Sequence, residues 1–326
     1  MIPFCGPSVK VRRQSAEGRP RPDWACQTGP ARLGRPGLAR PGCTLSISVT
    51  ANEEPHTQAQ STSHGAFPDG ARWRIEIPSV EGPDALQAVV DEAASRSVRV
   101  HRVSQGSGIL MLSDAEIEAM VSIGREHDIE VCLWAGSRSG WETGAPTPTA
   151  SALRGSDAVK SAIEEVERAV ALGIRSVLVS DLGLLAELGR ARRALIVPAD
   201  LTIKVSIMAA PANPASFALL AGLGADTINV PSDMTVGQLA ELRASSGAII
   251  DFYVEAPGNV GGQVRYRELA EIVEAAAPVH LKFGLRNAPD LYPTGAHIHA
   301  TVIACSRERV RRARLAMERL TAERRV

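Results

Sequence analysis

From residue 72 to the end of the chain, short strand-like runs alternate strictly with helical patterns, and the pair repeats eight times. Strict alternation is typical of parallel strands joined by crossover helices, and eight such units close a barrel. The sequence therefore predicts a (β/α)8 TIM-like barrel. The expected strands cover residues 72–79, 98–104, 129–136, 175–181, 202–208, 226–232, 249–256 and 278–285.

The helical segments carry recognisable start and stop signals. Pro83 favours a helix start, and Ser113 with Glu116 three residues later has the spacing of a capping box. A glycine ends the helical pattern over 156–173. The last helix is expected over 307–325, where it closes the barrel against the first and last strands. Its apolar side is expected to hold Val310, Ala313, Leu315, Met317 and Leu320.

Several strands are polar on one face, which favours a closed barrel over an open sheet that helices cover on both faces. In the run IIDFYVEA, Asp251, Tyr253 and Glu255 alternate with Phe252 and Val254. Alternation with a period of two sends side chains to opposite faces of a strand. We therefore expect the three ionisable side chains to line the barrel, with Glu255 nearest its mouth.

The N-terminal part of the chain differs from the rest. Residues 1–70 are rich in Pro, Gly and Arg and show neither a helical nor a strand period. Such a segment cannot bury enough apolar surface to offset the entropy of folding. We interpret residues 1–70 as a disordered extension and residues 71–326 as the barrel domain. An Arg-rich targeting peptide is the alternative, although the prolines would break the amphipathic helix that it needs.

Acidic and basic side chains balance, with 36 of each. No net charge therefore draws the chain to nucleic acid or to an anionic membrane. No apolar run is long enough to span a membrane, and no signal segment opens the sequence. We expect a soluble cytoplasmic protein that acts on a small-molecule or peptide substrate, and assembly into a homo-oligomer stays open.

The five cysteines are scattered without close pairs, which argues against a zinc site or a disulfide scaffold. Cys132 and Cys305 are most simply interpreted as small buried apolar residues. No P-loop, dinucleotide fingerprint or HExxH motif occurs in the sequence. A nucleotide cofactor is therefore not implied.

The functional residues of such barrels lie at the C-terminal ends of the strands, and two glutamates there are the main catalytic candidates. Glu76 and Glu255 suit a general acid and base, or a pair of metal ligands. The structural alternative is a buried ion-pair network with Lys204 and Lys282. Lys204 and Lys282 each also suit a Schiff-base nucleophile or a site for a substrate carboxylate, and for Lys204, early in its strand, a buried salt bridge is the alternative. Tyr253 completes the expected catalytic set.

Polar residues near the other strand ends are expected to bind substrate. The stretch 281–298 suits an anion site, where Arg286 offers a bidentate fork. The long loop over 135–157 suits a lid. His280 comes early in its strand and is interpreted as structural. The expected substrate-binding residues are His101, Gln105, Arg138, Ser206, Asn229, Asp233, Arg286 and Asn287.

The segments SDLGLLAEL, LTIKVSI, NPASFALLAGLGADTINVPSDMTVGQLAELR and IDFYVEAPG together resemble the peptidase U32 superfamily. The resemblance covers residues 73–290 in organisation, is strongest over 176–256, and is to a short, barrel-only branch of bacterial proteins. It implies a TIM-like barrel and a hydrolase, with proteolysis in some relatives and iron–sulfur-dependent hydroxylation in others.

Two departures limit what this resemblance implies. An iron–sulfur cluster takes four cysteines, and only Cys132 and Cys305 fall within the predicted barrel, so no iron–sulfur cluster is expected. Many relatives have His-Gly where this chain has Glu255 and Ala256. The peptidase mechanism therefore does not transfer residue by residue.

These features predict a U32-like peptidase or hydrolase with a TIM-barrel active site for a small anionic or carboxylate-bearing substrate. A carbon–carbon lyase that uses Lys282, or a divalent metal held by Glu76 and Glu255, is the first alternative. A barrel that binds a metabolite without catalysis is the second.

Overall fold

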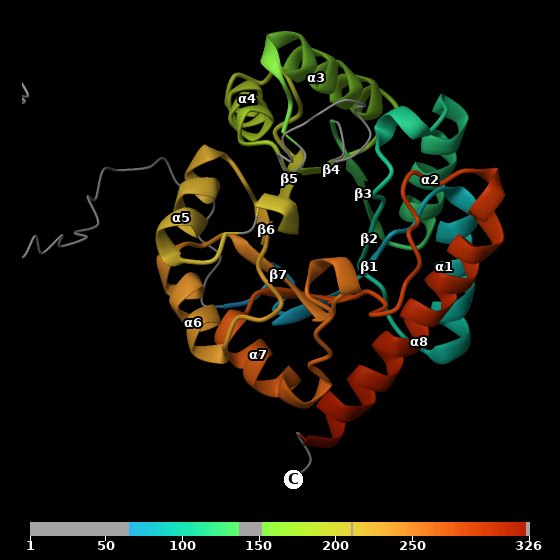
Figure 1. Ribbon diagram of the computed structural model, residues 1–326, viewed down its shortest axis with the longest axis vertical. Coiled ribbons are helices and arrows are strands. Elements are labelled where there is room, and N and C mark those ends of the chain that lie inside the picture. Colours follow the sequence, from blue (N-terminus) through green and yellow to red (C-terminus); the bar gives the residue numbers. More distant parts are fainter. Residues whose placement is uncertain (1–64, 137–151, 210, 324–326) are drawn as a thin grey trace, which may run out of the picture. The chain divides into compact units, whose positions relative to one another are not determined.

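The computed structural model describes residues 65–136, 152–209 and 211–323. Within these ranges eight parallel strands close a barrel in sequence order, so that β8 pairs with both β7 and β1 (Figure 1). The predicted (β/α)8 fold is confirmed. The strands are β1 (Trp73–Pro78), β2 (Arg102–Ser104), β3 (Glu130–Trp134), β4 (Ser176–Val179), β5 (Thr202–Val205), β6 (Thr227–Asn229), β7 (Ile249–Glu255) and β8 (Val279–Phe283).

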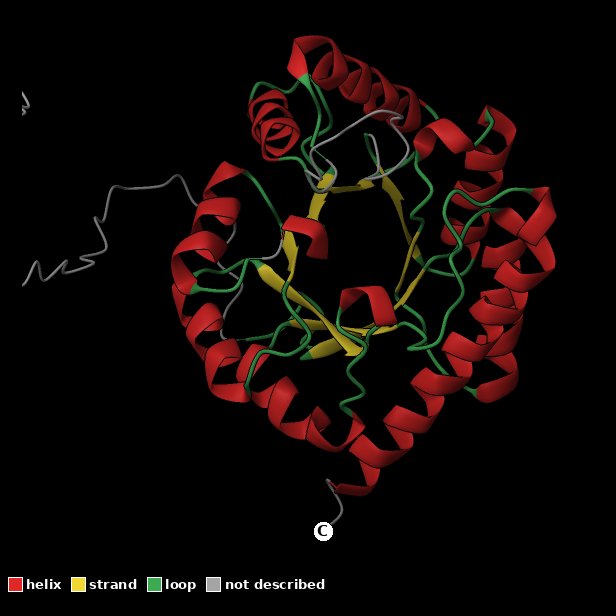
Figure 2. Cartoon of the chain, in the orientation of Figure 1, coloured by secondary structure: helices red, strands yellow, loops and turns green. Residues whose placement is uncertain are grey.

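Helices form an outer ring around the strands, with one α-helix after each strand of the described chain (Figure 2). The apolar outer faces of the strands, with Ile75, Val205 and Leu281 among them, pack against these helices in one core. The inner face carries polar side chains except near β3 and β4, where Cys132, Trp134 and Leu178 form a small apolar cluster. The helices are α1 (Pro83–Arg96), α2 (Asp114–Glu126), α3 (Gly155–Ala171), α4 (Leu182–Arg193), α5 (Pro214–Leu223), α6 (Val236–Ser245), α7 (Leu269–Ala276) and α8 (His299–Glu323).

The local signals in the sequence act where they were expected. Pro83 is the first residue of α1. Ser113 caps α2, and its side chain accepts from the backbone N of Glu116 while the Glu116 side chain accepts from the backbone N of Ser113. Gly173 follows α3 with a φ of 104°, a conformation that glycine adopts without strain. These caps fix the ends of the helices that frame the strands.

Helix α8 packs against α1, β1 and β8, as predicted, but it begins eight residues before the expected start. Val310, Ala313, Ala316 and Leu320 form its buried side. The expectation for Leu315 is wrong, because this side chain is 37% exposed. Leu315 lies two positions after Ala313, about 200° around a helix, so it cannot share that face.

The N-terminal end of the barrel is covered in part by residues that precede β1. Phe67 is buried and packs edge-on against His280, with 5.0 Å between the ring centroids. The guanidinium of Arg74 lies 4.3 Å from the centre of the Phe67 ring. Phe67 lies within residues 1–70, and the first 64 of these lie outside the described chain.

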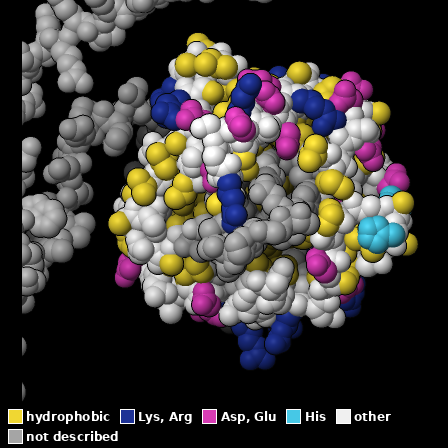
Figure 3. All heavy atoms as spheres, turned by 45° about the horizontal axis from the view of Figure 1, so that its top comes forward, with side chains coloured by type: hydrophobic (Ala, Val, Ile, Leu, Met, Phe, Trp, Pro, Cys, Tyr) yellow, Lys and Arg dark blue, Asp and Glu magenta, His cyan; other side chains and the backbone are white. Residues whose placement is uncertain are grey.

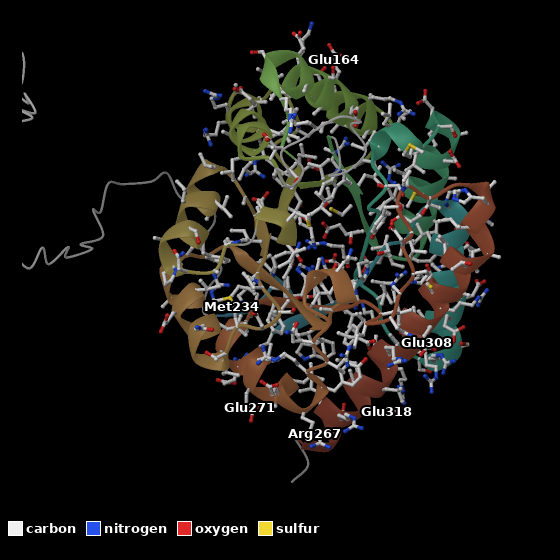
Figure 4. All side chains as sticks on the ribbon, viewed as in Figure 1. Glu164, Met234, Arg267, Glu271, Glu308 and Glu318 are labelled. Carbon is white, nitrogen blue, oxygen red and sulfur yellow. The ribbon has the colours of Figure 1, made fainter. Side chains whose placement is uncertain are left out.

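Charged side chains of both signs are mixed on the face that Figure 3 shows. Glu164, Glu271 and Glu318 point away from the barrel on the outer sides of α3, α7 and α8 (Figure 4). Among the described helices, none combines the length and the apolar character needed to cross a membrane. The outer ring therefore shows the polar exterior expected of an amphipathic helix layer.

Candidate active site

Five strands send charged side chains into the barrel lumen, where polar atoms gather at the centre of the ring of strands (Figure 4). Each of these residues is at most 2% exposed. Burial of so many charges is tolerable only when they pair with one another. The five residues are Glu76 of β1, Arg102 of β2, Lys204 of β5, Asp251 of β7 and Lys282 of β8.

Glu76 lies at the centre of this network. Its carboxylate accepts from Lys204 Nζ and, at 2.7 Å, from the hydroxyl of Ser104. Lys282 Nζ lies 3.3 Å from Glu76 Oε1. Lys204 Nζ also contacts Asp251 Oδ2 at 2.7 Å, so Lys204 bridges the two buried carboxylates.

The ion pairs change the protonation of both carboxyl groups. Burial alone would raise the pKa of Glu76, but Lys204 and Lys282 outweigh burial and lower this pKa to about 2. Burial also opposes ionisation of Asp251, whose pKa is nevertheless held well below its usual value by Lys204 and Arg102. Both carboxylates are therefore ionised at neutral pH.

Arg102 connects the network to the N-terminal end of the barrel. Its guanidinium lies 3.3 Å from Asp251 Oδ1, and its Nε lies 2.9 Å from Glu130 Oε1 at the start of β3. His280 Nδ1 lies 2.8 Å from the same Asp251 oxygen. Burial and the charge of Arg102 lower the pKa of His280, so this ring is neutral. The structural interpretation of His280 agrees with these contacts.

Lys282 lies on the mouth side of the network. Its ammonium donates to Asn229 Oδ1 at 2.7 Å and lies 4.4 Å from the centre of the Tyr253 ring. Asn229 ends β6, and Lys282 is the second-last residue of β8, so both are near the C-terminal strand ends. Within the described part of the chain, Lys282 has one carboxylate neighbour, Glu76, which it shares with Lys204.

The prediction that Glu255 points into the lumen is wrong. A register shift in the pairing of β7 with β8 falls between Tyr253 and Glu255, and Glu255 then pairs with the outward-facing Phe283. Such a bulge reverses the side to which the following residue points. Glu255 and Lys282 therefore lie on opposite sides of the sheet, and Glu255 does not face Glu76.

Glu255 instead joins elements outside the lumen. Its carboxylate accepts from the hydroxyl of Tyr266, in the short 3-10 helix Tyr266–Glu268, and from the backbone N of Arg286 at 3.1 Å. Arg312 of α8 lies 3.6 Å from the other oxygen. These contacts tie the segments after β7 and β8 to α8, which is a structural role.

Two of the residues that were expected to bind substrate do other things in the structure. His101 precedes β2 at the N-terminal end of the barrel, where its Nδ1 accepts from the backbone N of Ile75 at 3.1 Å. His101 is thus at the opposite end from the mouth, and its expected placement is wrong. The Gln105 side chain bonds both backbone groups of Gly108, which closes the loop after β2.

The other expected residues are spread over the mouth loops. Ser206 follows β5 and is buried, with its hydroxyl accepting from the backbone N of Met208 at 3.2 Å. Asp233, Arg286 and Asn287 are exposed in the loops after β6 and β8. Arg138 and most of the expected lid lie outside the described residues.

The loop after β8 is held over the ends of β1 and β2. The hydroxyls of Tyr292 and Ser79 lie 2.5 Å apart, and the backbone N of Thr294 donates to Ser107 Oγ at 2.9 Å. A Cβ atom at Gly106 would lie 2.5 Å from the Tyr292 ring, so only glycine permits this approach. Ser79 itself has a φ of 60°, a strained conformation for a serine.

Sequence reasoning missed Arg102 and Ser104. Both alternate with Val103 in the run VRVHRVS, and the same period-two pattern that indicated Lys204 and Lys282 was available there. Cys132, expected to be a buried apolar residue, is fully buried, and burial raises the pKa of its thiol to about 12. Among the described residues, no three His, Cys, Asp or Glu side chains are grouped to hold a metal ion.

No family model matches the chain, and no curated protein does. Solved structures with a similar fold include a U32 peptidase, at 20% identity over 61% of this chain and 75% of that chain, with a TM-score of 0.41. The YdjI aldolase from Escherichia coli K12 matches at 12% identity over 74% and 88%, with a TM-score of 0.46. A 3-hexulose-6-phosphate synthase matches at 14% identity over 74% and 99%, with a TM-score of 0.42. These likenesses concern the barrel fold alone.

Proposed function

We propose that this barrel is a lysine-dependent carbon–carbon lyase that acts on a small carboxylate-bearing carbonyl compound, with Lys282 as the reacting amine. The observation that carries the proposal is the position of Lys282 in the lumen. It is the buried lysine on the mouth side, in contact with Asn229, Tyr253 and Glu76. A lysine held in a dry barrel is the group that forms imines with carbonyl substrates.

The charges around Lys282 support an anionic substrate. Within the lumen, Glu76 and Asp251 face three cations, Arg102, Lys204 and Lys282. Lys204 contacts both carboxylates, and Arg102 has Glu130 as an additional partner at the N-terminal end. Positive charge is therefore least compensated at Lys282, which favours a carboxylate in the adjacent mouth.

Glu76 supports the chemistry as a fixed negative charge beside the reacting amine. Imine formation joins the free amine to the substrate carbonyl carbon and releases water, so the ammonium must first lose a proton. The ionised Glu76 carboxylate is 3.3 Å from Lys282 Nζ and accepts a hydrogen bond from Ser104 on the same oxygen. With its pKa lowered to about 2, Glu76 cannot hold this proton, which leaves to solvent; the negative charge of Glu76 instead stabilises the protonated imine.

Hydrolysis is the second candidate, and it rests on the resemblance of residues 176–256 to the U32 superfamily. The described residues offer it less support. The Ser104 hydroxyl donates to Glu76, and burial raises the pKa of the Cys132 thiol to about 12. His101 and His280 both lie toward the N-terminal end of the barrel, whereas a substrate would enter from the mouth at the C-terminal end. Among the residues that the structure describes, no hydroxyl or thiol nucleophile is therefore placed beside an activating histidine in the lumen.

A cleavage assay tests the proposal. Purified protein should release an oxoacid from one or more members of a panel of small 4-hydroxy-2-oxo acids, and Lys282→Arg should abolish the release because guanidinium forms no imine. Lys160→Arg is the matched control, since Lys160 is exposed on α3. Cleavage that survives Lys282→Arg would contradict the proposal. Hydrolysis of a peptide panel without cleavage of any oxoacid would favour the second candidate.

A further inference from the structure

The N-terminal end of the barrel contains a cavity of about 580 Å³. The starts of β3 and β4, the residue before β2, and the C-terminal ends of α2 and α3 line it. Pockets that hold small ligands commonly measure about 300–1,000 Å³. The volume therefore suits a small molecule, at the opposite end of the strands from the proposed active site.

The inner part of the cavity is polar and carries an acceptor and a donor. Glu130 contributes a carboxylate that is 31% exposed, and the hydroxyl of the buried Ser176 lies beside it. His101 accepts from the backbone N of Ile75 through Nδ1, which leaves Nε2 to carry the ring proton. Burial, with Arg99 and Arg74, lowers the pKa of His101 to about 4 and keeps the ring neutral.

The outer part of the cavity is basic. Arg74 pairs with Asp69 at 3.1 Å, Arg99 pairs with Asp128 at 2.7 Å, and Arg175 lies 3.6 Å from Asp200. Arg125, in the last turn of α2, forms no ion pair with any residue that the structure describes. One guanidinium at the rim is thus left for an anion from solution, and a guanidinium binds phosphate or carboxylate through two parallel hydrogen bonds.

We propose that this cavity is a second ligand site, for a small molecule that carries a phosphate or carboxylate at one end and a hydroxyl donor at the other. The acidic group binds Arg125 at the rim. The hydroxyl donates to the Glu130 carboxylate and accepts from the Ser176 hydroxyl at the inner end. The site is independent of the proposed lyase chemistry, because Lys282 does not line the cavity.

Calorimetric titration with glycerol 3-phosphate, glycerate, inorganic phosphate and glycerol tests the proposal. Glycerol 3-phosphate and glycerate, which carry both an acidic group and a hydroxyl, should bind in a saturable way. The one that binds more tightly shows whether the site prefers a phosphate or a carboxylate. Arg125→Gln should weaken the binding about 10-fold or more, because it removes a charged hydrogen bond. Arg190→Gln is the matched control, since Arg190 also lies exposed in the last turn of a helix, α4, away from the cavity.

Two more variants locate the ligand. Ser176→Ala should weaken the binding of glycerol 3-phosphate but not that of inorganic phosphate, because only glycerol 3-phosphate is long enough to reach the inner end of the cavity. Lys282→Arg should leave the binding unchanged. The proposal is overturned if none of the four compounds binds, or if Arg125→Gln and Arg190→Gln bind glycerol 3-phosphate and glycerate with equal affinity. It is also overturned if Lys282→Arg alone loses the binding. The last outcome would place the ligand in the barrel mouth.

Discussion

Two histidines and two carboxyl groups in the barrel are held in the protonation states that the lumen network requires. Burial, together with nearby arginines, lowers the pKa of His101 and of His280. Lysine and arginine neighbours outweigh burial and lower the pKa of Glu76 and of Asp251. At the residue scale, the stability of the barrel therefore depends on pH through groups that are wholly or largely buried.

Acid should destabilise the protein in two stages. An unfolded histidine binds a proton near pH 6.5, whereas folded His101 does so only near pH 4, so stability falls as the pH drops from 6.5 toward 4. The ionised Glu76 contributes its full share of the free energy of unfolding above its ordinary pKa of 4.5, and this share is lost as the pH falls toward 2. Urea denaturation midpoints between pH 7.5 and 3.5 should show both stages.

His101→Gln provides the control for the first stage. His280 shares that stage, so the variant should lose stability less steeply than the wild type between pH 6.5 and 4.5, without becoming independent of pH there. Below pH 4 the two proteins should lose stability with the same slope. Identical slopes in the upper range would show that His101 does not titrate as its surroundings imply.

At the element scale, the bulge in β7 decides which face Glu255 occupies. The sequence correctly predicted that Asp251 and Tyr253 face the lumen. Both pair with lumen-facing residues of β8, Asp251 with His280 and Tyr253 with Lys282. The same period-two reasoning failed at Glu255, because it assumes unbroken pairing with the neighbouring strand. Nothing in the run IIDFYVEA marks the shift, which depends on how β7 meets β8 in three dimensions.

Glu255→Gln should lower stability and leave lysine-dependent activity in place. The amide keeps the shape of the side chain but loses its charge toward Tyr266, the backbone N of Arg286 and Arg312. We expect the free energy of unfolding to fall by about 1–3 kcal/mol. Denaturant unfolding and the oxoacid cleavage assay, run on the same preparation, give both quantities. Unchanged stability with lost activity would place Glu255 in the active site.

At the scale of the whole molecule, the barrel was predictable because eight repeated units each carried strand and helix periods. The positions of individual residues along the barrel axis were not predictable from the sequence. The run 98–104 places His101 near the middle of a strand, but β2 begins only at Arg102, so His101 lies at the N-terminal end. Strand ends depend on the stagger of neighbouring strands, which a single strand's sequence does not contain.

The segment before the barrel should be dispensable except for its last residues. A chain that begins at Gly65 should unfold at the same temperature as the full chain, because residues 1–64 lack the composition of a folded core. Phe67→Ala in the full chain should lower the free energy of unfolding by about 3 kcal/mol, since Phe67 is buried against His280. A large drop in melting temperature for the shortened chain would refute the first expectation.

The central claim is that Lys282 is a reacting amine at the mouth of a buried charge network, and borohydride trapping tests it most directly. The protein is incubated with pyruvate, 2-oxobutyrate or 2-oxoglutarate, reduced with sodium borohydride, digested and mapped by mass spectrometry. The account predicts a reduced oxoacid adduct on the peptide that contains Lys282, and none there in Lys282→Arg. Trapping on Lys204 or Lys160 instead, or no adduct with any of the oxoacids, would contradict it.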